Sequence, residues 1–127
     1  MERVLGIGGV FFKARDPKKL AQWYRDNLGV PIDEDQSYGT FTAGNADGVE
    51  QTVWSLFEEG SDYLGDENAR VMVNYRVADL DAMLQQLRDA GARVDERVED
   101  FEYGRFGWAW DPEGNRFELW QPLGPGF

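Results

Sequence analysis

The sequence predicts an α+β fold built from two successive β-α-β-β-β units. A length of 127 residues fits a single domain that is large enough to bury a core. The composition, 42% apolar and 14% aromatic, is typical of a globular chain. Helix-start signals, helical periodicity and the order of strand candidates occur once in residues 1–60 and again in residues 68–127. We therefore expect one domain, residues 1–127, made of two repeats.

The first unit begins with a strand candidate at residues 4–14. Asp16 and Pro17 then have the chemistry of an N-cap and a first helical residue. The helix should end at Gly29, which suits a left-handed cap. Its apolar residues have the spacing of a helix that lies on a core: Leu20, Trp23, Tyr24 and Leu28. Turn clusters separate the strand candidates that follow, at residues 30–33, 38–43 and 50–57.

The second unit follows a charged connector at residues 58–68 and repeats this pattern. It begins with a strand candidate at residues 71–77, after which Asp79 is the N-cap of a second helix and Gly91 ends it. One face of this helix is apolar, with Leu80, Met83, Leu84 and Leu87. A further strand is expected at residues 92–98.

The chain should close with a hairpin of two strands at residues 105–110 and 115–121, both rich in Phe and Trp. The turn between them has Asp111, whose side chain can accept from the backbone two residues on, and Gly114, which tolerates positive φ. The second strand directs three side chains to one face: Arg116, Glu118 and Trp120. A carboxylate and an indole beside an aromatic strand predict the floor of a cleft.

The repeat has a fixed offset. A shift of 63 residues places Asp16 on Asp79, so that the two helix starts coincide. The same shift aligns further pairs: Leu20 with Met83, Gln22 with Gln85, and Arg25-Asp26 with Arg88-Asp89. Duplication of one supersecondary unit predicts approximate two-fold symmetry.

Composition excludes several kinds of chemistry. The chain has no Cys and no His, which removes disulfides, thiolate nucleophiles, Ser-His-Asp catalysis and ordinary catalytic zinc. Its net charge of −11 makes nucleic acid and an anionic membrane poor partners and would favour a cationic ligand, unless the acidity serves only solubility. The sequence shows neither a spanning segment nor a signal peptide, so a cytoplasmic location is expected.

The chain resembles the vicinal oxygen chelate superfamily over nearly its whole length. The resemblance rests on Asp-Pro at 16–17, Trp-Tyr-Arg-Asp-Asn-Leu-Gly at 23–29, Val-Ala-Asp-Leu-Asp at 77–81, and Asp-Pro-Glu-Gly-Asn-Arg-Phe-Glu-Leu-Trp at 111–120. That superfamily includes glyoxalase I, bleomycin-resistance proteins, extradiol dioxygenases and methylmalonyl-CoA epimerase. The resemblance implies paired βαβββ modules whose strands form an open, incomplete barrel around a cleft, with the helices outside. It also implies a homodimer.

The resemblance further implies where metal ligands would lie. In the metal-dependent members four ligands come from the first and last strands of each half, which here correspond to Gly9, Ser55, Met72 and Glu118. Only Glu118 is a carboxylate, and one carboxylate with a thioether does not hold a divalent ion tightly against water. We therefore expect the fold without a metal or other cofactor.

The candidate site residues have alternative interpretations. Glu118 is either a carboxylate of raised pKa that acts as acid or base in an aromatic cleft, or a structural ion-pair partner of Arg116 or Arg76. Trp108 and Trp110 either wall the cleft or pack against the helices. The candidate ligand-binding residues are Phe11, Ser55, Met72, Asn74, Arg76, Trp108 and Trp120, and Glu118 is the candidate catalytic residue.

Two functions follow from these residues. The first is metal-free binding of a small organic ligand, cationic or aromatic, in an aromatic cleft, for which bleomycin-resistance proteins are the analogy. The second is a glyoxalase-like lyase or isomerase that uses Glu118 on a carbonyl substrate. The absence of His and the single carboxylate at the ligand positions favour the binding function.

Overall fold

The computed structural model describes residues 1–45 and 48–123 of the chain. Within them lie seven strands and two helices. In chain order these are β1 (Gly6–Ala14), α1 (Pro17–Leu28), β2 (Tyr38–Asn45), β3 (Gly48–Glu58), β4 (Val71–Arg76), α2 (Leu80–Asp89), β5 (Arg93–Phe101), β6 (Gly104–Trp110) and β7 (Arg116–Pro122).

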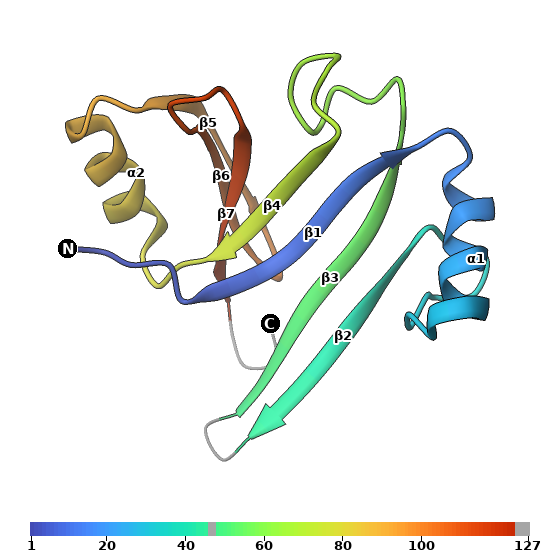
Figure 1. The fold of residues 1–127 in the computed structure, drawn as a ribbon. Helices are drawn as coiled ribbons and strands as arrows, with labels where there is room; N and C mark the ends of the chain where they lie inside the picture. The colour runs from blue at the N-terminus through green and yellow to red at the C-terminus, as the bar shows by residue number, and fades with distance from the viewer. Residues whose placement is uncertain (46–47, 124–127) are drawn as a thin grey trace.

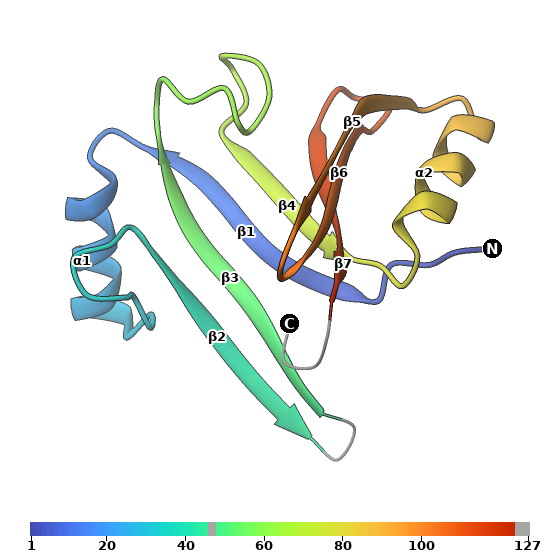
Figure 2. The same cartoon turned by 180° about the vertical axis from the view of Figure 1, so that it is seen from behind.

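All seven of these strands belong to one sheet, in the order β2-β3-β1-β4-β7-β6-β5. The sheet is strongly twisted and stays open, because β2 and β5 lie at its two ends (Figure 1). The helices lie outside it, α1 beside the first half and α2 beside the second, as the reverse view also shows (Figure 2). This architecture confirms the predicted α+β fold with an open, incomplete barrel.

The register of the sheet shows how the two halves are related. β1 and β4 run antiparallel at the centre, where Val10 lies opposite Val73. In the first half Phe11 lies beside Ser55 on a parallel strand, and in the second half Asn74 lies beside Glu118 in the same way. Both parallel pairs are separated by 44 residues. The offset of 63 residues found in the sequence therefore also relates these pairs of strands, as two-fold symmetry requires.

Both helices begin as their capping chemistry predicts. The side chain of Asp16 accepts from the backbone N–H of Lys19 at 3.2 Å, and that of Asp79 accepts from Ala82 at 3.0 Å. Gly29 ends α1 with a φ of 69°, in the left-handed region. Within the described parts of the chain, neither helix is long and apolar enough to cross a bilayer.

Side chains from the two faces of the sheet form separate clusters. On the outer face, α1 packs through Ala21 on Ala14 and Leu56, and α2 packs on Val77 and Leu119. The inner face is the face that carries Glu118. One cluster of buried apolar residues lies there, formed by Phe11, Leu64, Met72 and Trp108. Strand alternation explains why Glu118 and Leu119 lie on opposite faces.

Two expectations for the first unit are wrong in detail. The strand candidate at residues 30–33 is reduced to one isolated bridge between Ile32 and Gly39. The apolar face of α1 is also covered only in part, because Trp23 is 52% exposed and Leu28 is 65% exposed. Tyr24, in contrast, packs edge-on against Phe12 and Trp54.

Candidate functional site

The candidate site is organised around Glu118, which lies in the middle of β7 and is only 2% exposed. Asn74 lies beside it on β4 and Trp108 lies opposite it on β6. Asn74 donates from Nδ2 to Oε1 of Glu118 at 2.6 Å, and the indole N–H of Trp108 donates to Oε2 at 2.9 Å. The sheet register therefore brings two donors to a carboxylate that is shielded from water.

A third donor comes from outside the sheet. Tyr63 lies in the segment between β3 and β4, which we call loop 59–70, and its hydroxyl donates to Oε2 of Glu118. The next residue, Leu64, is fully buried against Phe11, Met72 and Trp108. The loop thus covers the inner face with the chain's own side chains.

These contacts set the electrostatics of the site. Burial raises the pKa of Glu118, and the hydrogen bonds from Tyr63, Asn74 and Trp108 oppose that rise. Burial together with the charge of Glu118 raises the pKa of Tyr63, so its hydroxyl stays protonated as a donor. The alternative that Arg116 or Arg76 pairs with Glu118 is wrong. Their ion-pair partners among the described residues are Asp95 and Glu50, respectively.

Asn74 depends on a close approach of β1. A Cβ atom on Gly8 would overlap Oδ1 of Asn74 and would lie 2.9 Å from Trp120. Gly8 sits where the pairing of β1 with β4 shifts register, which is typical of a bulge. Oδ1 of Asn74 is itself buried and has no hydrogen-bond partner among the described residues.

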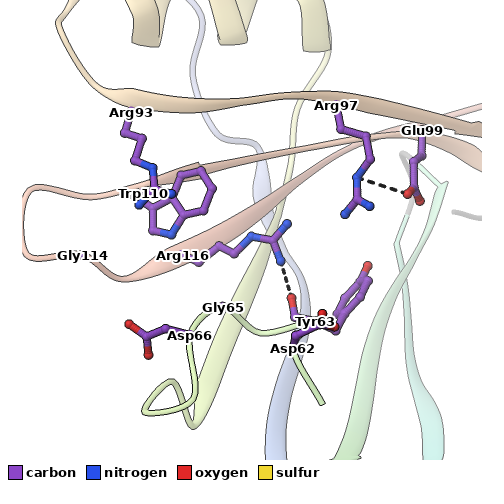
Figure 3. A pocket seen from close by; sticks show the side chains of 10 residues that line it. All are labelled: Asp62, Tyr63, Gly65, Asp66, Arg93, Arg97, Glu99, Trp110, Gly114 and Arg116. Carbon is purple, nitrogen blue, oxygen red and sulfur yellow. Dashed lines mark hydrogen bonds and ion pairs between the residues drawn. The ribbon is translucent and has the colours of Figure 1, made fainter. Parts of the chain in front are cut away.

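A pocket of about 530 Å³ opens beside this cluster, between loop 59–70 and strands β5–β7 (Figure 3). We call it the loop pocket. Arg93 lies over the indole of Trp110 with 3.8 Å between its Cζ and the ring centroid, and Arg97 pairs with Glu99 at 3.4 Å. Arg116 reaches from β7 and donates to the backbone carbonyl of Tyr63. The remaining lining residues are Asp62, Gly65, Asp66 and Gly114.

The structure brings together most of the side chains that the sequence singled out. Phe11, Met72 and Trp108 form one cluster, and Ser55 lies beside Phe11 in the register of β1 and β3. Trp108 therefore packs on the inner face and not against a helix. Asn74 and Glu118 are hydrogen-bonded neighbours.

Arg76 and Trp120 lie further along the same two strands, beside each other. Arg76 donates to the carbonyl of Gln51 at 2.8 Å, and Trp120 stacks on Phe106 with a centroid distance of 5.9 Å. Their buried side chains are held by these local contacts. Their proposed contact with a ligand stays a prediction.

The donor set does not fit a metal ion of the kind that the superfamily resemblance implies. Gly9 offers no side-chain ligand, and Met72 offers a thioether within an apolar cluster. The oxygens of Glu118 already accept three hydrogen bonds. Residues 1–45 and 48–123 contain no group of three or more His, Cys, Asp or Glu side chains that could hold a metal. A divalent ion requires several such oxygen or nitrogen ligands.

Sequence reasoning missed Tyr63 and Leu64, and with them the cover over the inner face. Residues 58–68 have the charge and glycine content of a connector. The available signal was the pair of adjacent aromatic and aliphatic residues within this charged loop. A solvent-exposed connector is usually polar, so such a pair indicates that part of the loop is buried. It also missed the arginines of the loop pocket, Arg93 and Arg97, which lie on a strand with mostly exposed side chains.

Comparison with known proteins identifies the family. The chain belongs to the glyoxalase-like domain family, whose model matches residues 9–120. It is 24% identical over 117 residues to the protein YraH of Bacillus subtilis (strain 168), covering 85% of this chain and 91% of that protein.

Solved structures extend the relationship. Methylmalonyl-CoA epimerase from Mycobacterium tuberculosis matches with 26% identity and a TM-score of 0.58, covering 95% of this chain and 90% of the epimerase chain. A glyoxalase/bleomycin resistance protein/dioxygenase superfamily member from Vibrio splendidus 12B01 matches with 15% identity and a TM-score of 0.59, covering 95% and 99%. The match of the glyoxalase-like family model over residues 9–120 confirms the superfamily indicated by the sequence motifs, and these structures share its fold.

Proposed function

We propose that this protein binds a small organic ligand with a planar aromatic part, without a metal, in the loop pocket. The pocket itself carries the proposal. Its volume of about 530 Å³ suits a small molecule, and two aromatic side chains, Trp110 and Tyr63, belong to its lining. This places the ligand beside the predicted aromatic cleft rather than inside it, because Leu64 and Tyr63 fill the space in front of Trp108.

The charges around the loop pocket indicate which ligand charge the pocket can accept. Three arginines and three carboxylates line it, so the net charge of −11 is not concentrated there. The cationic ligand suggested by composition would meet Asp62 and Asp66, whereas an acidic ligand would meet Arg93. We infer that the aromatic part of the ligand contributes most of the affinity and that its charge has the smaller effect.

The proposal is tested by titration with naphthalene derivatives that carry a carboxylate, an ammonium group or no charge, followed by tryptophan fluorescence. We expect saturable binding that Trp110→Leu weakens by about tenfold, the loss of one well-packed aromatic contact. Phe41→Leu is the matched control, since Phe41 is an exposed aromatic side chain on β2 that does not line this pocket. No saturable binding by any of the three probes, or equal loss in both variants, would contradict the proposal.

Metal dependence has its own test. The purified protein should keep both its probe affinity and its unfolding temperature after dialysis against a chelator. A stoichiometric, tightly held Zn, Ni, Mn or Fe ion in the purified protein would refute the metal-free part of the proposal.

A second function, catalysis by Glu118, is favoured by one observation. A buried carboxyl group of raised pKa next to a tyrosine hydroxyl is an arrangement that serves proton transfer. Against it, loop 59–70 separates Glu118 from solvent, so a substrate would have to displace Tyr63. Turnover of a 2-oxo aldehyde adduct or of a CoA thioester, abolished by Glu118→Gln, would establish it. The thioester is included because the structural neighbours contain a methylmalonyl-CoA epimerase.

A further inference from the structure

The hairpin of β2 and β3 is longer than its counterpart in the second half of the chain. Ser55 and Glu118 are equivalent in the two repeats, because each lies beside the central strand of its own half. β7 begins at Arg116, two residues before Glu118, whereas β3 begins at Gly48, seven residues before Ser55. The first hairpin therefore extends past the point where the second one turns, and it projects at the lower end of the sheet in Figure 1.

We call this extension the arm, and its described residues are 40–45 and 48–52. The β3 side of the arm is fixed to the rest of the sheet. Arg76 donates to the backbone carbonyl of Gln51 at 2.8 Å, and the hydroxyl of Thr52 donates to the carbonyl of Ile7 at 3.3 Å. These contacts hold the arm in place, so its other side, β2, has a defined orientation.

The outer edge of β2 is open along the arm. The carbonyl of Tyr38 points to this edge, since it accepts from the backbone N–H of Asp33 at 2.9 Å and not from β3. Strand alternation then directs the N–H and C=O groups of Thr42 and Gly44 to the same edge. Within the part of the chain that the structure describes, pairing at this edge ends at Gly39. The arm therefore offers free backbone donors and acceptors to another strand.

The two end strands of the sheet differ in their protection against pairing. In β5 six of the nine residues are charged, and its register shifts between Val94 and Val98. Charges and irregularities of this kind discourage an edge strand from pairing. β2, in contrast, reads Tyr-Gly-Thr-Phe-Thr-Ala-Gly-Asn without a charged residue, it pairs with β3 without a shift, and residues 41–44 are exposed. One edge of the sheet is thus protected and the other is able to pair.

A second copy of this chain fits the open edge. Each copy has a net charge of −11, so two copies repel one another unless they meet through an uncharged surface, and β2 is such a surface. Pairing of β2 with β5 of another copy would use the charged, irregular strand and would continue into an open filament. Pairing of β2 with β2 uses the same strand twice and closes with two-fold symmetry.

We propose that two copies of this protein associate by antiparallel pairing of their β2 edges, with Thr42 of both copies at the two-fold axis. In this register the two Thr42 residues exchange backbone hydrogen bonds. Phe41 lies opposite Ala43 and diagonal to Phe41 of the second copy, within reach of an aromatic side chain. This contact covers Phe41, which is 45% exposed in the single chain. The proposal does not depend on the function proposed for the loop pocket, because no residue of β2 lines that pocket.

Sedimentation equilibrium of the full chain tests the association. One pair of strands buries less area than a standard interface, so we expect a reversible dimer with a micromolar dissociation constant. Thr42→Pro removes an N–H group that the single chain does not use, and an edge strand tolerates proline at such a position. It also removes two symmetry-related hydrogen bonds of the dimer, so the dissociation constant should rise about thirtyfold. Thr42→Lys places like charges opposite each other and should weaken the dimer as well.

A matched variant separates the edge from general effects of charge. Gln22→Lys adds the same charge on the exposed side of α1 and should leave the dissociation constant unchanged. Far-UV circular dichroism checks that each variant keeps its fold. A chain that stays monomeric up to near-millimolar concentration would overturn the proposal. A dimer that both Thr42 variants leave intact, or that the two lysine variants weaken equally, would also overturn it.

The absence of cysteine from the chain allows a second test. Thr42→Cys should form a disulfide-linked dimer under mild oxidation, because residues that exchange hydrogen bonds across an antiparallel pair have Cα atoms about 5.5 Å apart, within the range of a disulfide. Gln22→Cys is the control and should stay largely monomeric at the same concentration. If the edge instead takes an extended segment of another protein, Thr42→Cys will link no faster than Gln22→Cys, and a second copy is not the partner.

Discussion

The hydroxyl of Tyr63 donates to the carboxylate of Glu118 across 55 positions of the sequence. This hydrogen bond joins a loop to the middle of the central sheet. Leu64 lies next to it in the apolar cluster of the inner face, and the carbonyl of Tyr63 accepts from Arg116. Together these contacts hold loop 59–70 over the inner face.

Tyr63→Phe should therefore loosen the loop without unfolding the sheet. The substitution keeps the ring and removes one hydrogen bond to a charged group, which is worth about 2 kcal/mol in the free energy of unfolding. Amide hydrogen exchange should accelerate in residues 59–70 and stay slow in β4 and β7. Tyr75→Phe is the control, since Tyr75 is a half-buried tyrosine on β4 that packs edge-on against Phe117 and, among the described residues, makes no hydrogen bond or ring contact with loop 59–70. Equal exchange in both variants would show that the hydroxyl does not hold the loop.

Glu118→Gln and Glu118→Ala should differ strongly in stability. A glutamine can accept from Tyr63 and Trp108 through its oxygen and donate through its nitrogen to Oδ1 of Asn74, once that amide flips. The flip moves the amide nitrogen of Asn74 to the position where its oxygen now has no partner, so the number of unpaired polar atoms at Asn74 stays the same. An alanine leaves three buried donors unpaired next to a cavity, at a cost of about 3 kcal/mol or more.

Urea unfolding of the two variants measures this difference. At neutral pH the free energy of unfolding of Glu118→Gln should equal or exceed that of the wild-type protein. A large loss in the glutamine variant would mean that the negative charge itself stabilises the site.

The pH dependence of the free energy of unfolding should also show the titration of the Glu118 carboxyl group. Its pKa is raised in the folded protein, so the folded state keeps the proton to higher pH than the unfolded chain does. The resulting stabilisation is complete below the unfolded-state pKa and is lost as pH rises through the folded-state pKa. Wild-type stability should therefore fall relative to Glu118→Gln across that interval and then run parallel to it.

The comparison with Glu118→Gln removes the contributions of other carboxyl groups. Arg105 lowers the pKa of Asp81, and hydrogen bonds from Asn115 lower that of Asp111. These two groups lose stabilisation as pH falls, which is the opposite sign, and they do so equally in both proteins. Urea unfolding from about pH 4 to pH 8 covers the expected range for a raised carboxyl pKa. A wild-type protein that gains stability over Glu118→Gln as pH rises would contradict the prediction.

Much of this fold could be predicted because its signals are local. Asp16 and Asp79 cap helices through contacts that span three residues. The closing turn depends on Asp111, which accepts from the backbone N–H groups of Glu113 and Asn115 at 2.9 Å. Strand alternation placed Glu118 and Trp120 on one face, and the sheet register agrees. Such patterns depend on neighbours along the chain and do not require knowledge of tertiary packing.

The cover over the site could not be predicted in the same way. Nothing in the periodicity of residues 59–70 shows which face of the sheet the loop will cross. The aromatic residues of the closing hairpin favour a cleft, but they do not show that Tyr63 and Leu64 fill the space in front of Trp108. For α1, the i, i+3, i+4 spacing located an apolar stripe without showing that the sheet leaves Trp23 uncovered. The homodimer implied by the superfamily resemblance stays a prediction, which sedimentation measurements can test.

Gly8 provides a test of the close approach on which the site depends. In Gly8→Ala the added methyl group would overlap Oδ1 of Asn74 and lie 2.9 Å from Trp120, both of which are buried. Because neither neighbour can move into solvent, we expect a loss of about 3 kcal/mol in the free energy of unfolding. Displacement of Asn74 should also disturb its hydrogen bond to Glu118, so the pH dependence described above should shift in this variant. Gly60→Ala is the matched control, since a Cβ atom there meets nothing within 4 Å. If both variants unfold at the same urea concentration, β1 does not pack on Asn74 as closely as the structure shows.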